Sequence, residues 1–202
     1  MTDNYELSRD RAQAYFLGFS QQKLIEQWAL DWDESYLYTK LFGVCYRICR
    51  KTGKVTDENG AQADYCQSLT IFDLLCHSDG RITPSGSFAA VNSLKGAPMS
   101  GGVTPSKHQK LAAKIEENPG KFREICEKMG AKSVKLADIC YQFTVFDRLQ
   151  VLLKFYHGDE EFPPTVTLLW DENTLEHMYY ETVFYAAACL MKMLGDALCP
   201  EA

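Results

Sequence analysis

Hydrophobic residues in the last third of the chain follow two periods, and together these predict much of the core. Three stretches are typical of strands: apolar residues alternate with polar ones at 141–145 and predominate at 149–156 and 165–170. Asp147-Arg148 predicts the turn between the first two. From Tyr180 the apolar residues recur at helical spacing, and Asn173 with Glu176 predicts a capping box before that helix. We therefore expect three strands covered by a long final helix.

The first 77 residues change from a helical to an alternating pattern and back. Residues 5–32 predict two short helices, the second capped by Ser20. Residues 36–57 alternate, with a turn at Thr52-Gly53, and so predict a β-hairpin. A stripe of apolar residues between 61 and 77 predicts a helix that lies on a sheet.

The segment 78–102 is rich in Gly, Ser and Pro, and it predicts either a lid or a loop held by a few apolar residues. Those residues are Phe88, Val91 and Leu94. Ser-Gly-Gly at 100–102 precedes a helix and could bind an anion, but it lacks the preceding strand of phosphate-binding motifs. Asn or Thr followed by Pro predicts helix starts for 105–117 and 119–129.

These elements predict an α+β fold: a mixed, largely antiparallel sheet of five to six strands, with helices mainly on one face and additional N-terminal helices. Its 202 residues suit a single domain, in which residues 1–35 form a helical arm and 36–202 the α+β core.

Composition narrows the classes of partner. A net charge of −6 with scattered lysines and arginines argues against nucleic acid, which needs a basic surface. No apolar run approaches the roughly 20 residues of a membrane span, and the N-terminus lacks the pattern of a signal peptide. We expect a cytoplasmic protein that binds neither nucleic acid nor membrane. The eight cysteines form no Cys-x-x-Cys pair, and we expect most to be reduced, buried side chains.

The turn that follows residue 156 carries the densest chemistry. His157, Asp159 and Glu161 alternate, so an extended backbone would place all three on one face, where they could bind a divalent metal or act in acid–base catalysis. The alternative is structural, because a carboxylate can cap backbone N–H groups or pair with Arg148.

Other candidates are ambiguous in the same way. Asp171 ends a strand and Glu181 lies early in the last helix, where either could be a metal ligand or a helix-capping acid. Glu181 is also four residues from His177, which is the spacing of a metal pair or of a surface ion pair. Asp73 and His77 repeat that spacing, and His108 is expected to be exposed.

The segment His157-Gly-Asp-Glu-Glu-Phe-Pro-Pro164, with Trp170-Asp171 and the helix that bears Glu181, resembles the family called domain of unknown function 3786 (DUF3786). The order of the upstream elements is also similar to that family. The resemblance implies an anaerobic source, and some members carry a four-cysteine iron–sulfur module like that of corrinoid proteins. This chain lacks that module, which puts electron transfer through a bound cluster in doubt.

Three functional hypotheses follow. The first is a binding or accessory protein for a small molecule, with a corrinoid or haem as the tetrapyrrole implied by the resemblance. Its pocket would lie between 78–102 and the acidic turn, with His157 as axial ligand beside Phe88 and Tyr156. The second is a metal-dependent enzyme that uses His157, Asp159 and Glu161 with Asp171 or Glu181. The third is a non-catalytic subunit that binds another protein through Trp28 and Trp32.

Overall fold

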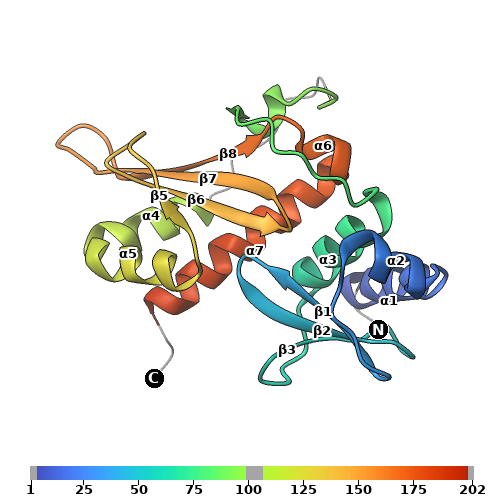
Figure 1. Cartoon of the computed structure of the whole chain (residues 1–202). Coiled ribbons are helices and arrows are strands. Elements are labelled where there is room, and N and C mark those ends of the chain that lie inside the picture. The colour runs from blue at the N-terminus through green and yellow to red at the C-terminus, as the bar shows by residue number, and fades with distance from the viewer. Residues whose placement is uncertain (1–3, 99–106, 200–202) are drawn as a thin grey trace.

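A computed structural model describes residues 4–98 and 107–199, and it places two antiparallel sheets among seven α-helices in that part of the chain (Figure 1). The chain begins with α1 (Asn4–Leu17) and α2 (Gln21–Trp28). Ser20 caps α2 as predicted, because its side chain accepts a hydrogen bond from the Lys23 N–H. Phe16 of α1 is fully buried against Phe72, with ring centroids 5.1 Å apart. The N-terminal helices therefore pack on the third helix rather than extending into solvent.

The predicted hairpin contains one more turn than the sequence pattern suggested. Its strands are β1 (Tyr36–Leu41), β2 (Val44–Cys49) and β3 (Val55–Asp57), which pair in that order. The turn at 52–53 is confirmed, but residues 41–49 are not one strand. Phe42 and Gly43 form a two-residue turn with φ of 51° and 79°, the arrangement of a type I′ hairpin. The alternation of apolar residues runs through this turn without interruption, so the pattern concealed it.

Helix α3 (Tyr65–His77) confirms the predicted helix but begins four residues later. Asp64 accepts a hydrogen bond from the Gln67 N–H, and the Gln67 side chain accepts one from the Asp64 N–H. This reciprocal capping box fixes the start of the helix.

The segment after α3 contains the two-residue strand β4 (Phe88–Ala89) and a short 3₁₀ helix (Val91–Ser93). Leu94 is buried, whereas Phe88 and Val91 are partly buried. The Ser-Gly-Gly stretch at 100–102 and the predicted helix start at 104–105 lie outside the described residues.

Helices α4 (Lys107–Glu117) and α5 (Pro119–Lys128) follow. Asn118 caps α5 as predicted, since its side chain accepts a hydrogen bond from the Lys121 N–H. Gly130 follows this helix with a φ of 75°, the left-handed backbone that is common where a helix ends.

The second sheet has the order β4-β8-β7-β6-β5 and is antiparallel throughout. It is formed by β5 (Lys132–Ser133), β6 (Ile139–Phe146), β7 (Leu149–Tyr156) and β8 (Thr165–Asp171) together with β4. The α+β class and the three central strands are confirmed. The strands divide into two sheets, however, where the sequence had suggested one mixed sheet.

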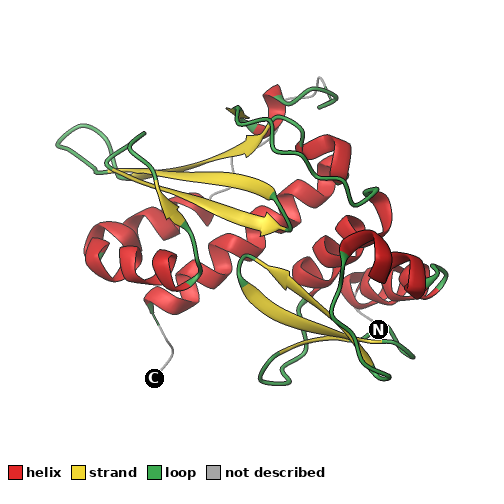
Figure 2. Ribbon diagram, viewed as in Figure 1, coloured by secondary structure: helices red, strands yellow, loops and turns green. Residues whose placement is uncertain are grey.

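Helices α6 (Thr174–His177) and α7 (Tyr180–Leu198) complete the described chain. The predicted capping box before them does not form, because the Asn173 side chain instead donates to the Thr83 carbonyl, 2.9 Å away. In Figure 2, α4, α5 and α7 lie on one side of the five-stranded sheet, while α1, α2 and α3 gather beside the other sheet. The buried side of α7 carries Val183, Ala186, Leu190 and Leu194.

None of the helices between residues 4–98 or 107–199 has the length and apolar character that crossing a bilayer requires.

Candidate functional site

His157 lies directly after β7 and is held by two acidic residues. Its Nδ1 lies 2.9 Å from Oε2 of Glu116, near the end of α4, and its backbone N–H donates to Asp138 at 2.9 Å. The edge of its ring meets Phe155 at a centroid distance of 5.1 Å. The side chain is 46% exposed. His157 therefore joins the start of the turn to α4, and its Nδ1 is engaged by a carboxylate.

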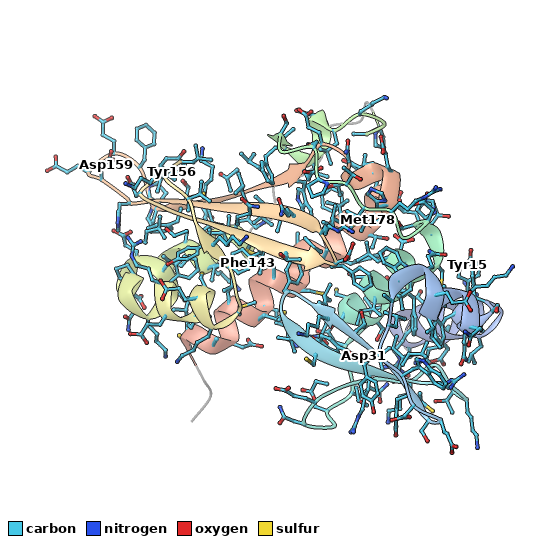
Figure 3. The ribbon with its side chains drawn as sticks, viewed as in Figure 1. Tyr15, Asp31, Phe143, Tyr156, Asp159 and Met178 are labelled. Atoms are coloured by element: carbon cyan, nitrogen blue, oxygen red, sulfur yellow. The ribbon has the colours of Figure 1, made fainter. Side chains whose placement is uncertain are left out.

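The carboxylate of Asp159 is turned toward its own loop. Its Oδ1 accepts hydrogen bonds from the Glu161 and Phe162 N–H groups at 2.9 and 2.8 Å, while its own N–H donates to the Phe162 carbonyl. The Phe162 and Glu161 N–H groups hold the pKa of Asp159 below its usual value. Figure 3 shows Asp159 and Tyr156 at the end of the sheet far from Met178. This carboxylate has the capping role that was the structural alternative.

The predicted metal cluster is not assembled. Extended backbone would place His157, Asp159 and Glu161 on one face, but the chain turns at Gly158, where an added Cβ would lie 2.8 Å from Pro164 Cδ. His157 and Asp159 then bind separate partners, and Glu161 is exposed. In the part of the chain that the structure covers, no three His, Cys, Asp or Glu side chains converge to hold a metal.

Asp171 has a different role at the other end of β8. It is fully buried, and its two oxygens accept hydrogen bonds from the N–H groups of Ser85 (2.9 Å), Gly86 (3.4 Å) and Asn173 (3.0 Å). Two of these donors belong to the segment after α3. Asp171 therefore anchors that segment to the sheet, and these hydrogen bonds explain how its carboxylate can be buried.

The predicted cofactor residues are also separated. Phe88 pairs with Asp171, whereas Tyr156 pairs with Thr165, so the two aromatic residues lie at opposite ends of β8. Thr165 and Asp171 are six positions apart along β8, which amounts to roughly 20 Å. The placement of the two aromatic side chains therefore does not support one pocket that contains both.

Glu181 and His177 do not form the predicted pair on one helix. The helical conformation is interrupted between α6 and α7, so the two residues lie on different helices, with Glu181 exposed and His177 buried. Nδ1 of His177 lies 3.0 Å from Oγ of Ser78, and burial lowers the pKa of His177. Sequence reasoning missed this contact because the two residues lie 99 positions apart.

The other predicted His–Asp pair, Asp73 and His77 of α3, contacts Tyr179 at the start of α7. Asp73 accepts a hydrogen bond from the Tyr179 N–H at 2.9 Å, and burial raises its pKa. The ring of His77 lies against Tyr179, with centroids 4.1 Å apart. His108, which was expected to be exposed, is partly buried beside β8, and its pKa is lowered by burial.

A well-defined hollow lies elsewhere, between β2, α5 and the end of α7. It measures about 670 Å³. Its position depends on the β1–β2 turn, because the Phe42 N–H donates to the Val145 carbonyl at 3.0 Å and Gly43 lies against the backbone of Met129. Lys121 of α5 donates to the Leu198 carbonyl at 2.7 Å and so ties α5 to α7. All three walls are therefore fixed by hydrogen bonds or close backbone packing.

The lining of this cavity, called here the β2–α5–α7 cavity, is largely apolar with a charged rim. Val44, Ile125, Met129 and Met193 are each only partly buried there. Tyr46, whose pKa is raised by burial, lies at the base, and its hydroxyl accepts a hydrogen bond from Gln67. The remaining lining residues are Gly43, Cys45, Glu58, Lys121, Glu124, Lys128 and Ala197. The cavity can hold an apolar body and offers both signs of charge to its polar groups.

Sequence analysis missed this cavity because its residues come from three distant segments and none belongs to a motif. The only available signal was Gly43 in an otherwise alternating apolar run, which marks a bend or a close backbone approach.

The two tryptophans proposed for protein binding differ. Trp28 is partly buried, and its indole N–H donates to the Leu75 carbonyl at 3.1 Å while its ring contacts Phe146. Trp32 is 53% exposed, and the Arg50 guanidinium lies 5.2 Å from its ring centroid. Trp32 is therefore the available surface residue.

A family model described as domain of unknown function, DUF3786, matches residues 21–193. No curated protein and no solved structure matches the chain.

Proposed function

This chain belongs to the DUF3786 family, a domain of unknown function, and we propose that it is a cytoplasmic small-molecule-binding or accessory protein whose site is the β2–α5–α7 cavity. Its volume, about 670 Å³, lies well inside the range of small-molecule sites, about 300–1,000 Å³.

One observation supports this proposal above all. Four apolar side chains, those of Val44, Ile125, Met129 and Met193, face the cavity without being fully buried. Apolar surface left in contact with water is unfavourable by about 25 cal/mol per Å², and a bound apolar group would remove it from water. The charged rim supplies the few polar contacts that orient a ligand.

A tetrapyrrole, either a corrinoid or a haem, is the ligand class to test first. His157 cannot serve as its axial ligand here, because it lies beside α4 at the acidic turn. The sulfur donors that line the cavity are the thiol of Cys45 and the thioethers of Met129 and Met193. Thiolate and thioether sulfur are both axial ligands of haem iron in proteins.

The test measures binding of three probes to the full-length protein purified under anaerobic conditions: haem, hydroxocobalamin and a fluorescent apolar dye. Ala197→Trp places a large side chain in the cavity. Ala90→Trp is the matched control, because residue 90 is exposed beside β4 and lies outside the cavity lining. We expect at least one probe to bind wild type and Ala90→Trp, and to bind Ala197→Trp at least tenfold more weakly. The site is rejected if no probe binds, or if Ala197→Trp binds as wild type does.

A second candidate function, binding of another protein, is favoured by the exposed aromatic residues near β1. Trp32 and Tyr38 are 53% and 39% exposed, and Tyr, Trp and Arg side chains such as Arg50 are enriched at binding hot spots. Affinity purification with Trp32→Ala tests it. The control is Phe162→Ala, which removes a side chain that is 66% exposed at the distant acidic turn. A partner retained by the control and lost with Trp32→Ala supports this function, and equal recovery from both variants opposes it.

A further inference from the structure

The segment between α3 and β4, called here the 79–87 strap, runs as irregular backbone past α6 toward the end of β8 (Figure 1). Asp171 accepts hydrogen bonds from two of its N–H groups, and the Asn173 side chain donates to one of its carbonyls. Ile82 is 2% exposed and packs in the core. Because these few contacts hold it, the strap can separate from the fold at a lower free energy than global unfolding requires.

A buried histidine holds the start of the strap. Nδ1 of His177 lies 3.0 Å from Oγ of Ser78, and the same oxygen accepts the Gly80 N–H at 3.4 Å. The Ser78 carbonyl accepts a hydrogen bond from the Gln27 side chain of α2 at 2.6 Å. His177 and Ser78 are 6% and 4% exposed. The strap therefore begins at a buried point that joins α6 to α2.

A positive charge on the His177 imidazole is poorly compensated in this position. The titratable groups that face the ring come from each neighbouring element: Asp79 of the strap, Asp171 of β8, Glu176 of α6 and His77 of α3. Of the acids, Asp79 is bound to Arg81 at 2.7 Å, and the oxygens of Asp171 are occupied by backbone N–H groups. Between residues 4–98 and 107–199 no carboxylate forms an ion pair with His177. Burial therefore outweighs the attraction of the acids and lowers the pKa of His177.

We propose that His177 is a pH-dependent latch of the 79–87 strap: protonation of the imidazole favours separation of the strap from α6, which exposes Ile82. In the open form the imidazole is in water, where its pKa is about 6.5. The open form therefore binds a proton more strongly than the closed form, and opening is favoured as the pH falls below about 6.5. The latch does not depend on the function proposed for the β2–α5–α7 cavity.

The same linkage sets the size of the effect. When the closed form stays neutral, the equilibrium constant for opening rises about tenfold between pH 7.5 and pH 5.5, because only the open form takes up the proton. Proton uptake by the closed form reduces that increase. We therefore expect a rise of about three- to tenfold across this range.

Hydrogen exchange of the full-length protein, followed by mass spectrometry at pH 7.5 and pH 5.5, measures this opening. Each observed rate is compared with the intrinsic exchange rate at the same pH, which gives a protection factor. Peptides that contain Gly80, Ser85 and Gly86 report on the strap, because these N–H groups bond Ser78 and Asp171. In wild type their protection should fall about three- to tenfold at pH 5.5, while that of peptides from β7 stays unchanged.

Three variants assign the effect to one ring. His177→Gln keeps an amide that can bond Ser78 but cannot become charged, so the fall in strap protection at pH 5.5 should disappear. His157→Gln is the matched control, because its side chain is 46% exposed and bonds Glu116 of α4. His77→Gln removes the neighbouring imidazole of α3. Both His157→Gln and His77→Gln should keep the wild-type response.

A second measurement needs no variant. Nuclear magnetic resonance of wild type with labelled histidine should show His177 titrating at a lower pH than in a peptide of residues 172–182. The proposal is overturned if the wild-type strap shows no change in protection, if the change persists in His177→Gln, or if β7 loses protection equally. A pKa of His177 at or above that of the peptide would also overturn it.

Discussion

Gly43 joins the two sheets, and its replacement by alanine tests that arrangement. Gly43 has a φ of 79°, and an added Cβ would clash with the Met129 carbonyl oxygen and lie 3.2 Å from the carbonyl carbon. Neither atom can rotate away, because both belong to the backbone that follows α5. The turn is held from its other side by the Phe42 N–H, which donates to Val145 in β6. A methyl group can therefore be accommodated only if the hairpin separates from the second sheet.

Gly130→Ala is the matched control for the size of the stability loss expected from Gly43→Ala. Its φ is 75°, and nothing lies within 4 Å of an added Cβ, so it reports the cost of the left-handed backbone alone. That cost is about 1–2 kcal/mol for a residue with a side chain. Gly43→Ala carries the same cost plus that of an overpacked contact, about 1–3 kcal/mol. We expect losses of about 1–2 kcal/mol for Gly130→Ala and about 2–5 kcal/mol for Gly43→Ala.

Urea denaturation followed by tryptophan fluorescence and circular dichroism measures both free energies of unfolding. Because Gly43 lines the β2–α5–α7 cavity, Gly43→Ala should also weaken any ligand that this cavity binds. Equal destabilisation by the two substitutions would refute the close approach of the hairpin to Met129.

Three further predictions follow. Asp171→Ala should cost about 1–3 kcal/mol in urea denaturation and speed proteolysis near residue 85, because three backbone N–H groups lose their acceptor. Exposed Glu172→Ala should change stability by less than about 0.5 kcal/mol, and similar values for both would contradict the anchoring role. His157→Ala should lower the free energy of unfolding by less than about 1 kcal/mol, since the His157–Glu116 pair is partly exposed. A loss above about 2 kcal/mol would contradict this small contribution of the pair to stability. Because the pKa of His177 is lowered in the folded protein, the unfolded chain binds a proton at this residue first as the pH falls, so the free energy of unfolding should decline from about pH 6.5 toward the folded pKa. Unfolding of His177→Gln measured across this range should depend less on pH, and an unchanged pH dependence would argue against the lowered pKa of His177 as its cause.

Local signals in the sequence were sufficient for most elements. Ser20 and Asn118 cap their helices through side chains that bond N–H groups three positions away, so the structure depends only on neighbouring residues. Strands β6 and β7 are rich in apolar residues because most of their positions are buried, whereas β8 alternates between exposed and buried positions. Asn173 failed as a cap because a distant carbonyl, that of Thr83, competes for its side chain.

What could not be predicted depends on contacts between distant segments. A two-residue turn at Phe42 preserves the alternation of burial on either side, so the pattern cannot distinguish one long strand from two short ones. The division into two sheets follows from that turn, because the hairpin meets β6 through the Phe42 N–H rather than through a strand ladder. Long-range pairing of this kind leaves no periodic trace in the sequence.

The acidic turn shows why concentrated chemistry is a weak guide to a site. A tight turn exposes backbone N–H groups that need acceptors, and Asp159 supplies them for Glu161 and Phe162. The same need is met by Asp171 for the segment after α3. Carboxylates whose oxygens already accept such bonds have less capacity to bind a metal or a substrate. The β2–α5–α7 cavity, by contrast, is bounded by apolar side chains that the fold has left only partly buried, such as Met129 and Met193. For this family the motif at 157–164 is therefore better interpreted as a requirement of the fold, and ligand binding should be sought where packing remains incomplete.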